Sequence, residues 1–267
     1  MNKNLKGFTL VELAIVLVII GLLVGGVLQG QELIKQAQLR NVVRAFSEMD
    51  TALNTFRAKY NALPGDFAAA TAFGVNAPRT GGANLAATPA TAPGDGNGDN
   101  SLGEGTSFTT FVNWDGEMAN FFVMLNNAEL VKGSFTQATG CISSGTPCSH
   151  AVTTAYPSLP IGGGFIALTA GGQLNYVTGI TGAATTAAMA ASLGLAPQDA
   201  YSIDSKIDDG LPLTGIVQAI KNYTSGAFVS DTAAGGPPST TCITSSANSY
   251  NTPLLTNLCT IRVRASG

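Results

Sequence analysis

One carboxylic acid, Glu12, stands inside an otherwise apolar stretch near the start of the chain. Residues 8–28 contain no other ionisable side chain, and as a helix they would extend over roughly 30 Å, the thickness of the hydrocarbon core of a bilayer. Lys3 and Lys6 precede this run, and positive charge favours the cytoplasmic side of a membrane. An acidic side chain at bilayer depth costs about 2.5–3.5 kcal/mol or more. We therefore expect Glu12 to be neutralised or paired with a cation.

A second group of oxygen-bearing side chains lies in a glycine-rich stretch. Asp95, Asn97 and Asp99 occupy alternate positions, like the start of a calcium loop, because a hard cation takes several oxygen ligands from a tight turn. The EF-hand pattern then fails at its sixth and twelfth positions, and Glu104 is a further candidate ligand from a different angle. The stretch is either a calcium site formed by these four residues or a glycine- and aspartate-rich surface loop.

Four cysteines form two candidate disulfides. Cys141 and Cys148 stand close together, and Cys242 and Cys259 bracket a polar stretch near the C-terminus. If residues 8–28 cross the membrane, the rest of the chain is exported and meets an oxidising compartment, where disulfides form. Of the three possible connectivities, the one that pairs the cysteines nearest in sequence has the smallest entropic cost of loop closure. Because His150 is the single histidine, a zinc site at the cysteines lacks further ligands. We predict the disulfides Cys141–Cys148 and Cys242–Cys259.

Catalytic constellations are not evident in the sequence. Asp208 and Asp209 are adjacent carboxylates within an acidic turn at 204–212. Successive residues usually point apart, so a solvated turn or a second set of cation ligands is favoured over acid–base catalysis. No nucleophile–base arrangement or phosphate loop accompanies them, and the net charge of −3 gives no basic footprint for nucleic acid. We expect a protein that is not an enzyme and does not bind nucleic acid.

A long N-terminal helix must position Glu12. Beyond the apolar run, apolar residues recur three and four apart, as in the buried stripe of an amphipathic helix. These residues are Leu39, Val42, Phe46, Met49, Leu53, Phe56 and Tyr60. Joined to the apolar run, the stripe predicts one helix that ends before Pro64.

The remainder of the chain alternates short helices, short strands and long loops. A helix is expected within 114–131, and an aperiodic surface loop precedes it. Strands are predicted at 164–168, 173–180, 215–220 and 259–263, and short helices at 183–194 and 197–202. The fold class is therefore α+β, in which the second half of the long N-terminal helix packs on an antiparallel sheet, with extended loops and two disulfides.

The N-terminal residues carry a family resemblance. The sequence K-G-F-T-L-V-E-L, from Lys6 to Leu13, with its basic leader and the apolar run behind it, resembles the N-terminus of type IV pilins and pseudopilins. The resemblance implies cleavage after Gly7 by a prepilin peptidase, N-methylation of Phe8 and a role for Glu12 in assembly. It implies a leader peptide at 1–7, a long helix at 8–60 whose first part (8–28) is the transmembrane and assembly segment, and a globular α+β head at 61–267.

The resemblance also implies a function. The chain would be a structural subunit of a type IV pilus or of the pseudopilus of a type II secretion system. It would wait in the bacterial inner membrane with its head in the periplasm, then join a helical filament at the cell surface or in the periplasm. Its partners would be other copies or related pilins, the prepilin peptidase and an inner-membrane assembly platform.

Two alternatives and one analogy accompany this interpretation. A minor pilin with an adhesive or ligand-binding head is the first alternative, and a membrane-tethered enzyme is the second. Some pseudopilins bind calcium in a loop of the head, which by analogy favours the calcium interpretation of residues 95–104.

Overall fold

The structure is a computed structural model of the 267-residue chain. The residues that it describes are 9–76, 95, 96, 98–102, 117–135, 156–161, 164–180, 195–224, 227–230, 242–244, 248–253 and 259–266. Within this part of the chain, three helices and five strands follow one another in the order α1, α2, β1, β2, α3, β3, β4, β5.

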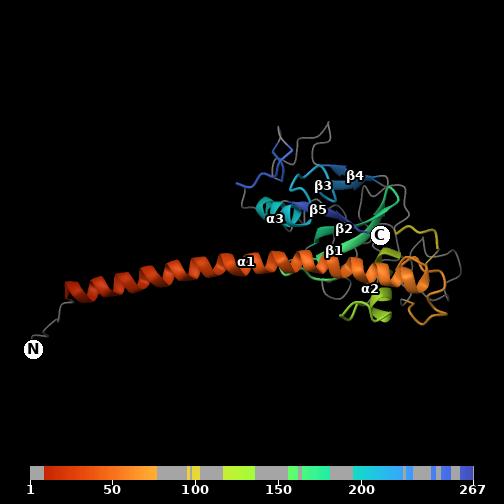
Figure 1. Ribbon diagram of the computed structural model, residues 1–267, viewed down its shortest axis with the longest axis horizontal. Coiled ribbons are helices and arrows are strands. Elements are labelled where there is room, and N and C mark those ends of the chain that lie inside the picture. The colour runs from red at the N-terminus through yellow and green to blue at the C-terminus, as the bar shows by residue number, and fades with distance from the viewer. Residues whose placement is uncertain are drawn as a thin grey trace, which may run out of the picture.

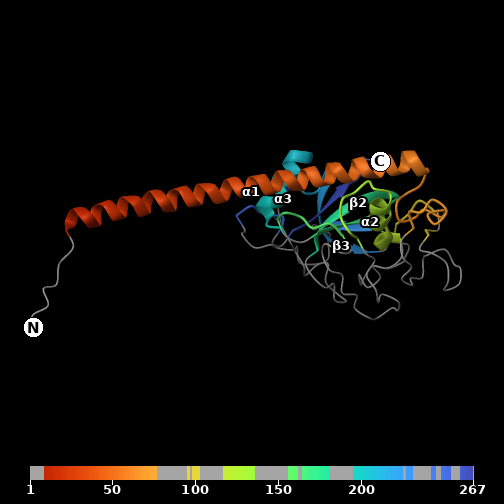
Figure 2. The ribbon, with the colours of Figure 1, turned by 90° about the horizontal axis from the view of Figure 1, so that it is seen from below.

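The helix α1 (Leu10–Tyr60) dominates the shape of the molecule. It runs along one side of the head and extends far beyond it at the N-terminal end (Figures 1 and 2). The helix ends where Asn61 adopts a left-handed conformation and donates its backbone N–H to the Arg57 carbonyl. The seven residues of the predicted apolar stripe are buried, Tyr60 partly so. The prediction of one continuous helix with a buried second half is confirmed.

A five-stranded antiparallel sheet packs against this second half. Its strand order is β1-β2-β5-β3-β4. The strands are β1 (Gly164–Ala170), β2 (Gln173–Ile180), β3 (Val217–Thr224), β4 (Ala227–Ser230) and β5 (Thr260–Arg264). The C-terminal strand β5 lies between two hairpins and pairs with β2 and β3. The last residues of the chain therefore join the two halves of the sheet.

Aromatic packing joins α1 to the sheet. The Phe46 ring lies 5.2 Å between centroids from Phe165 on β1 and 6.1 Å from Tyr176 on β2. Phe165 also contacts Phe122 of α2 (Glu117–Asn127) at 5.7 Å. All four side chains are at most 3% exposed. The second half of α1 is thus part of the core of the head.

The structure corrects some of the predicted bounds. The helix expected within 114–131 is α2, which is shorter, and β4 was not predicted. The helix expected to end at residue 202 is α3 (Pro197–Ile207). It continues because Ile203 and Asp204 lie on a buried face, so the acidic stretch at 204–212 begins inside a helix. The helix predicted at 183–194 lies outside the described residues.

Candidate functional site

The first half of α1 presents an uncovered apolar surface. Its large apolar side chains from Leu10 to Ile34 are all at least 50% exposed. Among the described residues, α1 is the one helix long and apolar enough to cross a membrane, and its most apolar stretch is not buried in the molecule. An apolar surface of this extent marks contact with lipid or with other proteins.

Glu12 takes part in a capping box at the start of this segment. Its carboxylate accepts hydrogen bonds from the backbone N–H and the hydroxyl of Thr9, each at 2.9 Å. The Glu12 N–H in turn donates to the Thr9 hydroxyl oxygen at 3.3 Å. Two of the unsatisfied N–H groups at the helix start are thereby bonded. Gly7 and Phe8 lie outside the described residues, so the expected pairing of Glu12 with a cation, the cleavage after Gly7 and the methylation of Phe8 stay predictions.

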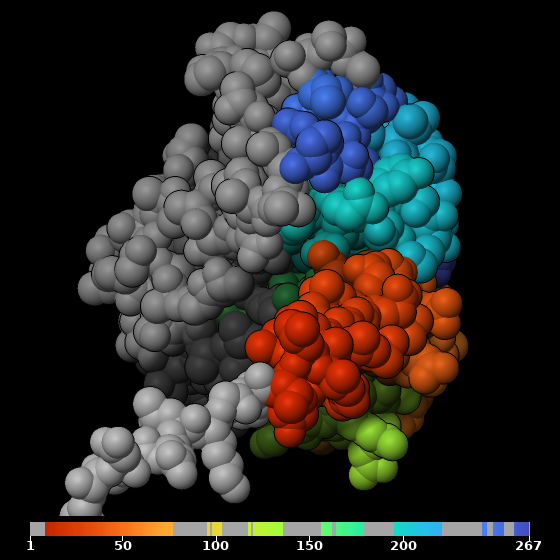
Figure 3. Space-filling model, turned by 90° about the vertical axis from the view of Figure 1, so that its left-hand side faces the viewer, coloured from red at the N-terminus to blue at the C-terminus, as the bar shows by residue number. Residues whose placement is uncertain are grey.

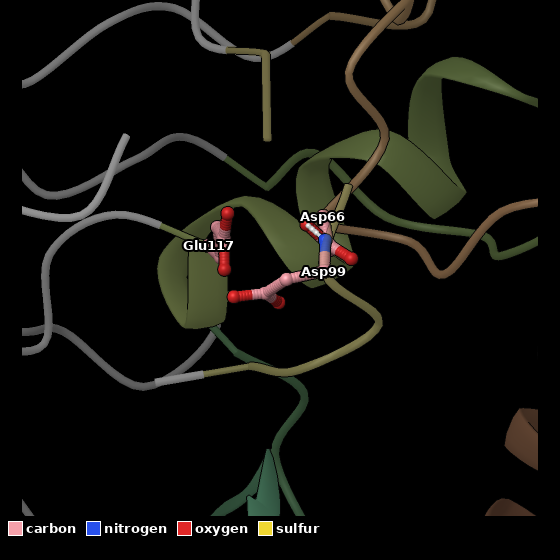
Figure 4. A group of neighbouring side chains, drawn as sticks. All are labelled: Asp66, Asp99 and Glu117. Carbon is pink, nitrogen blue, oxygen red and sulfur yellow. Dashed lines mark hydrogen bonds between the residues drawn. The ribbon is translucent and has the colours of Figure 1, made fainter. Parts of the chain in front are cut away.

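Three carboxylates from different parts of the chain meet at the far end of α1. Asp66 follows the turn that ends α1, Asp99 belongs to the glycine-rich loop, and Glu117 opens α2; Figure 4 shows the three side chains facing one common space. One oxygen of each lies within 4.8 Å of those of the other two. Asp66 and Glu117 are each only 2% exposed, whereas Asp99 is exposed.

The glycine-rich loop wraps around the Asp66 carboxylate. One oxygen accepts the N–H groups of Gly98 at 2.5 Å and Asp99 at 3.2 Å, and the other accepts the N–H of Asn100 at 2.5 Å. Burial raises the pKa of Asp66, and the hydrogen bonds from Gly98 and Asn100 partly offset this rise. A Cβ at Gly96 would lie 2.1 Å from the Asp66 carbonyl carbon, so this close approach requires glycine.

The predicted calcium ligands separate in the structure. Asp99 joins the three-carboxylate cluster, but one oxygen of Asp95 accepts the N–H and the hydroxyl of Thr71, each at 2.8 Å. Asn97 and Glu104 lie outside the described residues. Sequence reasoning missed the buried acids Asp66 and Glu117. Their separation along the chain hid them, although Asp66 follows a Pro-Gly turn directly.

The second group of acidic residues, in the stretch 204–212, stabilises a turn through hydrogen bonds. Asp204 is fully buried and accepts the Tyr250 hydroxyl at 2.8 Å, and burial raises its pKa to about 6. Asp208 and Asp209 accept hydrogen bonds from backbone and hydroxyl groups within residues 211–217. Through these hydrogen bonds the three carboxylates hold the segment after α3 in its conformation, which is a structural role.

One predicted disulfide is present and the other lies outside the described residues. Cys242 and Cys259 are bonded, with Cα atoms 5.1 Å apart. Cys259 directly precedes β5, so the bond fastens the chain at the entry to the strand that joins the two hairpins. Cys141 and Cys148 are not among the described residues, and their pairing stays a prediction.

Comparisons with known proteins give one match at the N-terminus. Residues 2–28 match the family model of the prokaryotic N-terminal methylation motif. No curated protein matches the sequence. Among solved structures, the major type IV pilin PilA1 from Clostridium difficile is similar at 9% identity over 87% of this chain and 96% of that chain. The TM-score is 0.35.

The motif and the architecture agree. A helix with an exposed apolar first half and a second half packed on an antiparallel sheet makes this an α+β fold. The prokaryotic N-terminal methylation motif covers residues 2–28, which include much of the exposed first half of α1.

Proposed function

We propose that this chain is a structural filament subunit, a pilin or pseudopilin of a type IV pilus or a type II secretion pseudopilus. In this proposal, prepilin peptidase cleaves after Gly7, Phe8 is N-methylated, and α1 polymerises with other copies or related pilins. One observation carries the proposal: the methylation motif lies at the N-terminal end of a helix whose large apolar side chains are exposed as far as Ile34. The head carries no catalytic role in it.

The proposed location follows from α1. Before assembly the apolar segment spans the bacterial inner membrane, and the head lies in the periplasm. An inner-membrane assembly platform then moves the subunit into a filament, where neighbouring helices replace lipid around the exposed segment. Both environments cover the same apolar surface, so the exchange is not opposed by exposure of that surface to water.

Glu12 has two competing partners in this proposal. Before cleavage its carboxylate caps the helix through Thr9. Cleavage creates a charged amine at Phe8, and methylation preserves that charge. A neighbouring subunit displaced along the filament axis can then bring its own Phe8 amine to Glu12. A misplaced subunit would leave a buried charge uncompensated, so the pair selects the register of assembly.

Three substitutions test whether the charge of Glu12 drives assembly. Glu12→Gln keeps an acceptor for the Thr9 N–H and removes the charge, whereas Glu12→Ala and Glu12→Val remove both. We expect all three to be inserted and cleaved but poorly incorporated into sheared filaments. Thr9→Ala is the matched control, because it weakens the cap and keeps the charge. If Glu12→Gln assembled at the wild-type rate, the charge would have no role. If wild-type chain were neither cleaved nor found in filaments, the filament function itself would be wrong.

A minor pilin with a ligand-binding head is the second candidate. A groove of about 650 Å³ runs beside α1 and is lined also by residues 129–132, 135 and 157–158, with Met49 and Phe165 among its apolar residues. A ligand-binding subunit is needed at few positions in a filament, whereas a main subunit is made in large excess. The ratio of this chain to other filament proteins in sheared material distinguishes the two.

Calcium binding by the glycine-rich loop is a separate proposal. Its ligands from the sequence are Asp95, Asn97, Asp99 and, with a weaker case, Glu104. Support comes from the carboxylates of Asp66 and Glu117, which lie beside Asp99 in an arrangement of oxygen atoms of the type that calcium takes. A cation there would offset the mutual repulsion of three neighbouring acids.

A further inference from the structure

One end of the head faces the N-terminus of α1. Figure 3 views the molecule from that end. On one side of the helix the described surface contains α3 and the residues after it, coloured cyan, and residues near 242–253, coloured blue, whereas residues of 117–135, coloured yellow-green, lie on the other side. If α1 spans a bilayer, this end of the head is the one nearest to the membrane.

The contact between α1 and α3 determines how far this end of the head lies from the apolar run of α1. Asp199 in the first turn of α3 is bonded to Lys35 of α1. Lys35 lies about 10 Å along the helix from Leu28, the last residue of the apolar run. The headgroup layer on each side of a bilayer is about 5–8 Å thick. A transmembrane helix tilts by about 20° on average, and a tilt toward α3 lowers a helix packed roughly 10 Å to the side of α1 by about 3 Å. With the helix tilted to that side, the start of α3 reaches the headgroup layer.

The outward face of α3 suits that layer. The exposed residues of α3 are Gln198, Tyr201, Ser205 and Lys206, and Tyr201 is 42% exposed. Tyrosine and lysine are side chains that place an apolar body at the membrane boundary and a polar end in water. No carboxylate belongs to this face.

The acids of α3 are turned away from it. Asp199 is only 13% exposed and is paired with Lys35, and Asp204 is buried against Tyr250. Both negative charges are therefore satisfied inside the head. This removes the repulsion that free carboxylates would meet at an anionic lipid surface.

The segment after α3 extends the same surface. A Cβ at Gly210 would lie 3.2 Å from the Tyr201 ring, so the segment runs beside that side chain. It exposes Leu211 by 40% and Ile216 by 43%. Asp208 and Asp209 of this segment accept internal hydrogen bonds. Asp209 is nevertheless exposed, so one carboxylate lies on this surface together with the Lys206 ammonium. Apolar side chains beside a tyrosine and a lysine are typical of interfacial membrane contact.

We propose that Tyr201, Lys206, Leu211 and Ile216 form a headgroup face that rests on the lipid headgroups of the periplasmic leaflet while the subunit awaits assembly. The proposal rests on the proposed function in one respect, that α1 spans the membrane. Entry into a filament would then require release of this face from the lipid as well as transfer of α1.

Fluorescence quenching in vesicles tests the headgroup face. The full chain has one tryptophan, Trp114, and a Trp114→Phe background allows a single probe. Tyr201→Trp places the probe on the headgroup face. Phe73→Trp is the matched control, because Phe73 is also an exposed aromatic residue but follows the opposite end of α1. Each protein is reconstituted into vesicles of phosphatidylethanolamine and phosphatidylglycerol that contain a headgroup-labelled quenching lipid.

We expect strong quenching of the probe at position 201 and only background quenching at position 73. Equal quenching at the two positions in chains that float with the vesicles would overturn the headgroup face. Quenching that disappears as the protein-to-lipid ratio rises would also overturn it, because contact between heads would then displace the lipid. Failure to float would instead contradict the membrane-spanning role of α1. Leu211→Trp provides a second probe should Tyr201→Trp disturb folding.

Discussion

The Lys35 ammonium lies 2.8 Å from the Asp199 carboxylate and joins α1 to α3 at the point where α1 leaves the head. The apolar side chains up to Ile34 are exposed, and from Leu39 onward the stripe is buried. The ion pair thus marks the boundary between the exposed apolar half of α1 and the half that belongs to the head.

Asp199→Asn should lower the free energy of unfolding of the head by less than about 1 kcal/mol, because Lys35 is 44% exposed and surface pairs are weak. The loss should shrink in high salt, which screens the pair. Denaturant unfolding of the full chain in detergent at two salt concentrations measures it. Asp209→Asn is the control for loss of an aspartate charge, since that carboxylate accepts the Leu211 N–H and the Thr214 hydroxyl. A loss that does not depend on salt would contradict an electrostatic role for the Lys35–Asp199 pair.

Phe46→Ala should destabilise the head by about 3–5 kcal/mol, because it opens a cavity between α1 and two strands. Leu22→Ala is the matched control on the same helix. Leu22 is 72% exposed, so its removal should leave the unfolding of the head unchanged. Thermal unfolding of both variants in detergent provides the comparison. Equal effects would mean that the second half of α1 is not part of the core.

Replacing Cys242 and Cys259 together by serine should cost about 3 kcal/mol, the value for a closed loop of about 15 residues in the chain-entropy model. Their separation of 17 residues is close to that length. Unfolding of the double variant, compared with oxidised wild type, measures the loss. Non-reducing peptide mapping that linked Cys242 or Cys259 to Cys141 would show a different connectivity.

Asp204 should make the stability of the head depend on pH. Burial raises its folded pKa to about 6 from an ordinary value of 3.8, so the folded state holds the proton more tightly than the unfolded state. The contribution to stability is present below about pH 4, is lost as pH rises to about 6, and amounts to at most about 3 kcal/mol.

The isosteric variant Asp204→Asn isolates this effect, because its amide can bond the Tyr250 hydroxyl without titrating. Relative to wild type, the variant should gain stability between pH 4 and pH 7. Unfolding curves across this range provide the measurement. Asp209→Asn is the control in the same segment. Parallel pH profiles for wild type and Asp204→Asn would mean that this carboxyl does not carry the dependence.

Calcium at about 100 times its dissociation constant should add roughly 2.7 kcal/mol to the stability of the full chain if it binds only the folded state. Asp99→Asn should abolish the gain, because Asp99 belongs both to the loop pattern and to the cluster with Asp66 and Glu117. Melting in chelator and in millimolar calcium measures it, and Asp209→Asn should keep the wild-type response.

Two further variants distinguish the calcium ligand sets. Loss of the response in Glu117→Gln but not in Asp95→Asn would assign the ion to the cluster, and the reverse would assign it to the predicted loop ligands. Identical melting of wild type with and without calcium would end the calcium proposal.

The sequence determined the elements whose signals are local. The apolar run and the stripe from Leu39 to Tyr60 are periodic over many turns, so α1 could be predicted with its buried face. The hairpin of β1 and β2 has a glycine turn between two β-type runs. The methylation motif depends on residues adjacent in the chain. The Cys242–Cys259 bond followed from nearness in sequence.

Only the tertiary structure decided what depends on contacts distant in sequence. Asp66, Asp99 and Glu117 meet because the glycine-rich loop folds back onto the turn after α1, and no periodic pattern encodes that approach. The place of β5 between β2 and β3 likewise depends on pairing across long separations. Sequence patterns report which face of an element is apolar, whereas the partner of that face is chosen by packing over the whole head.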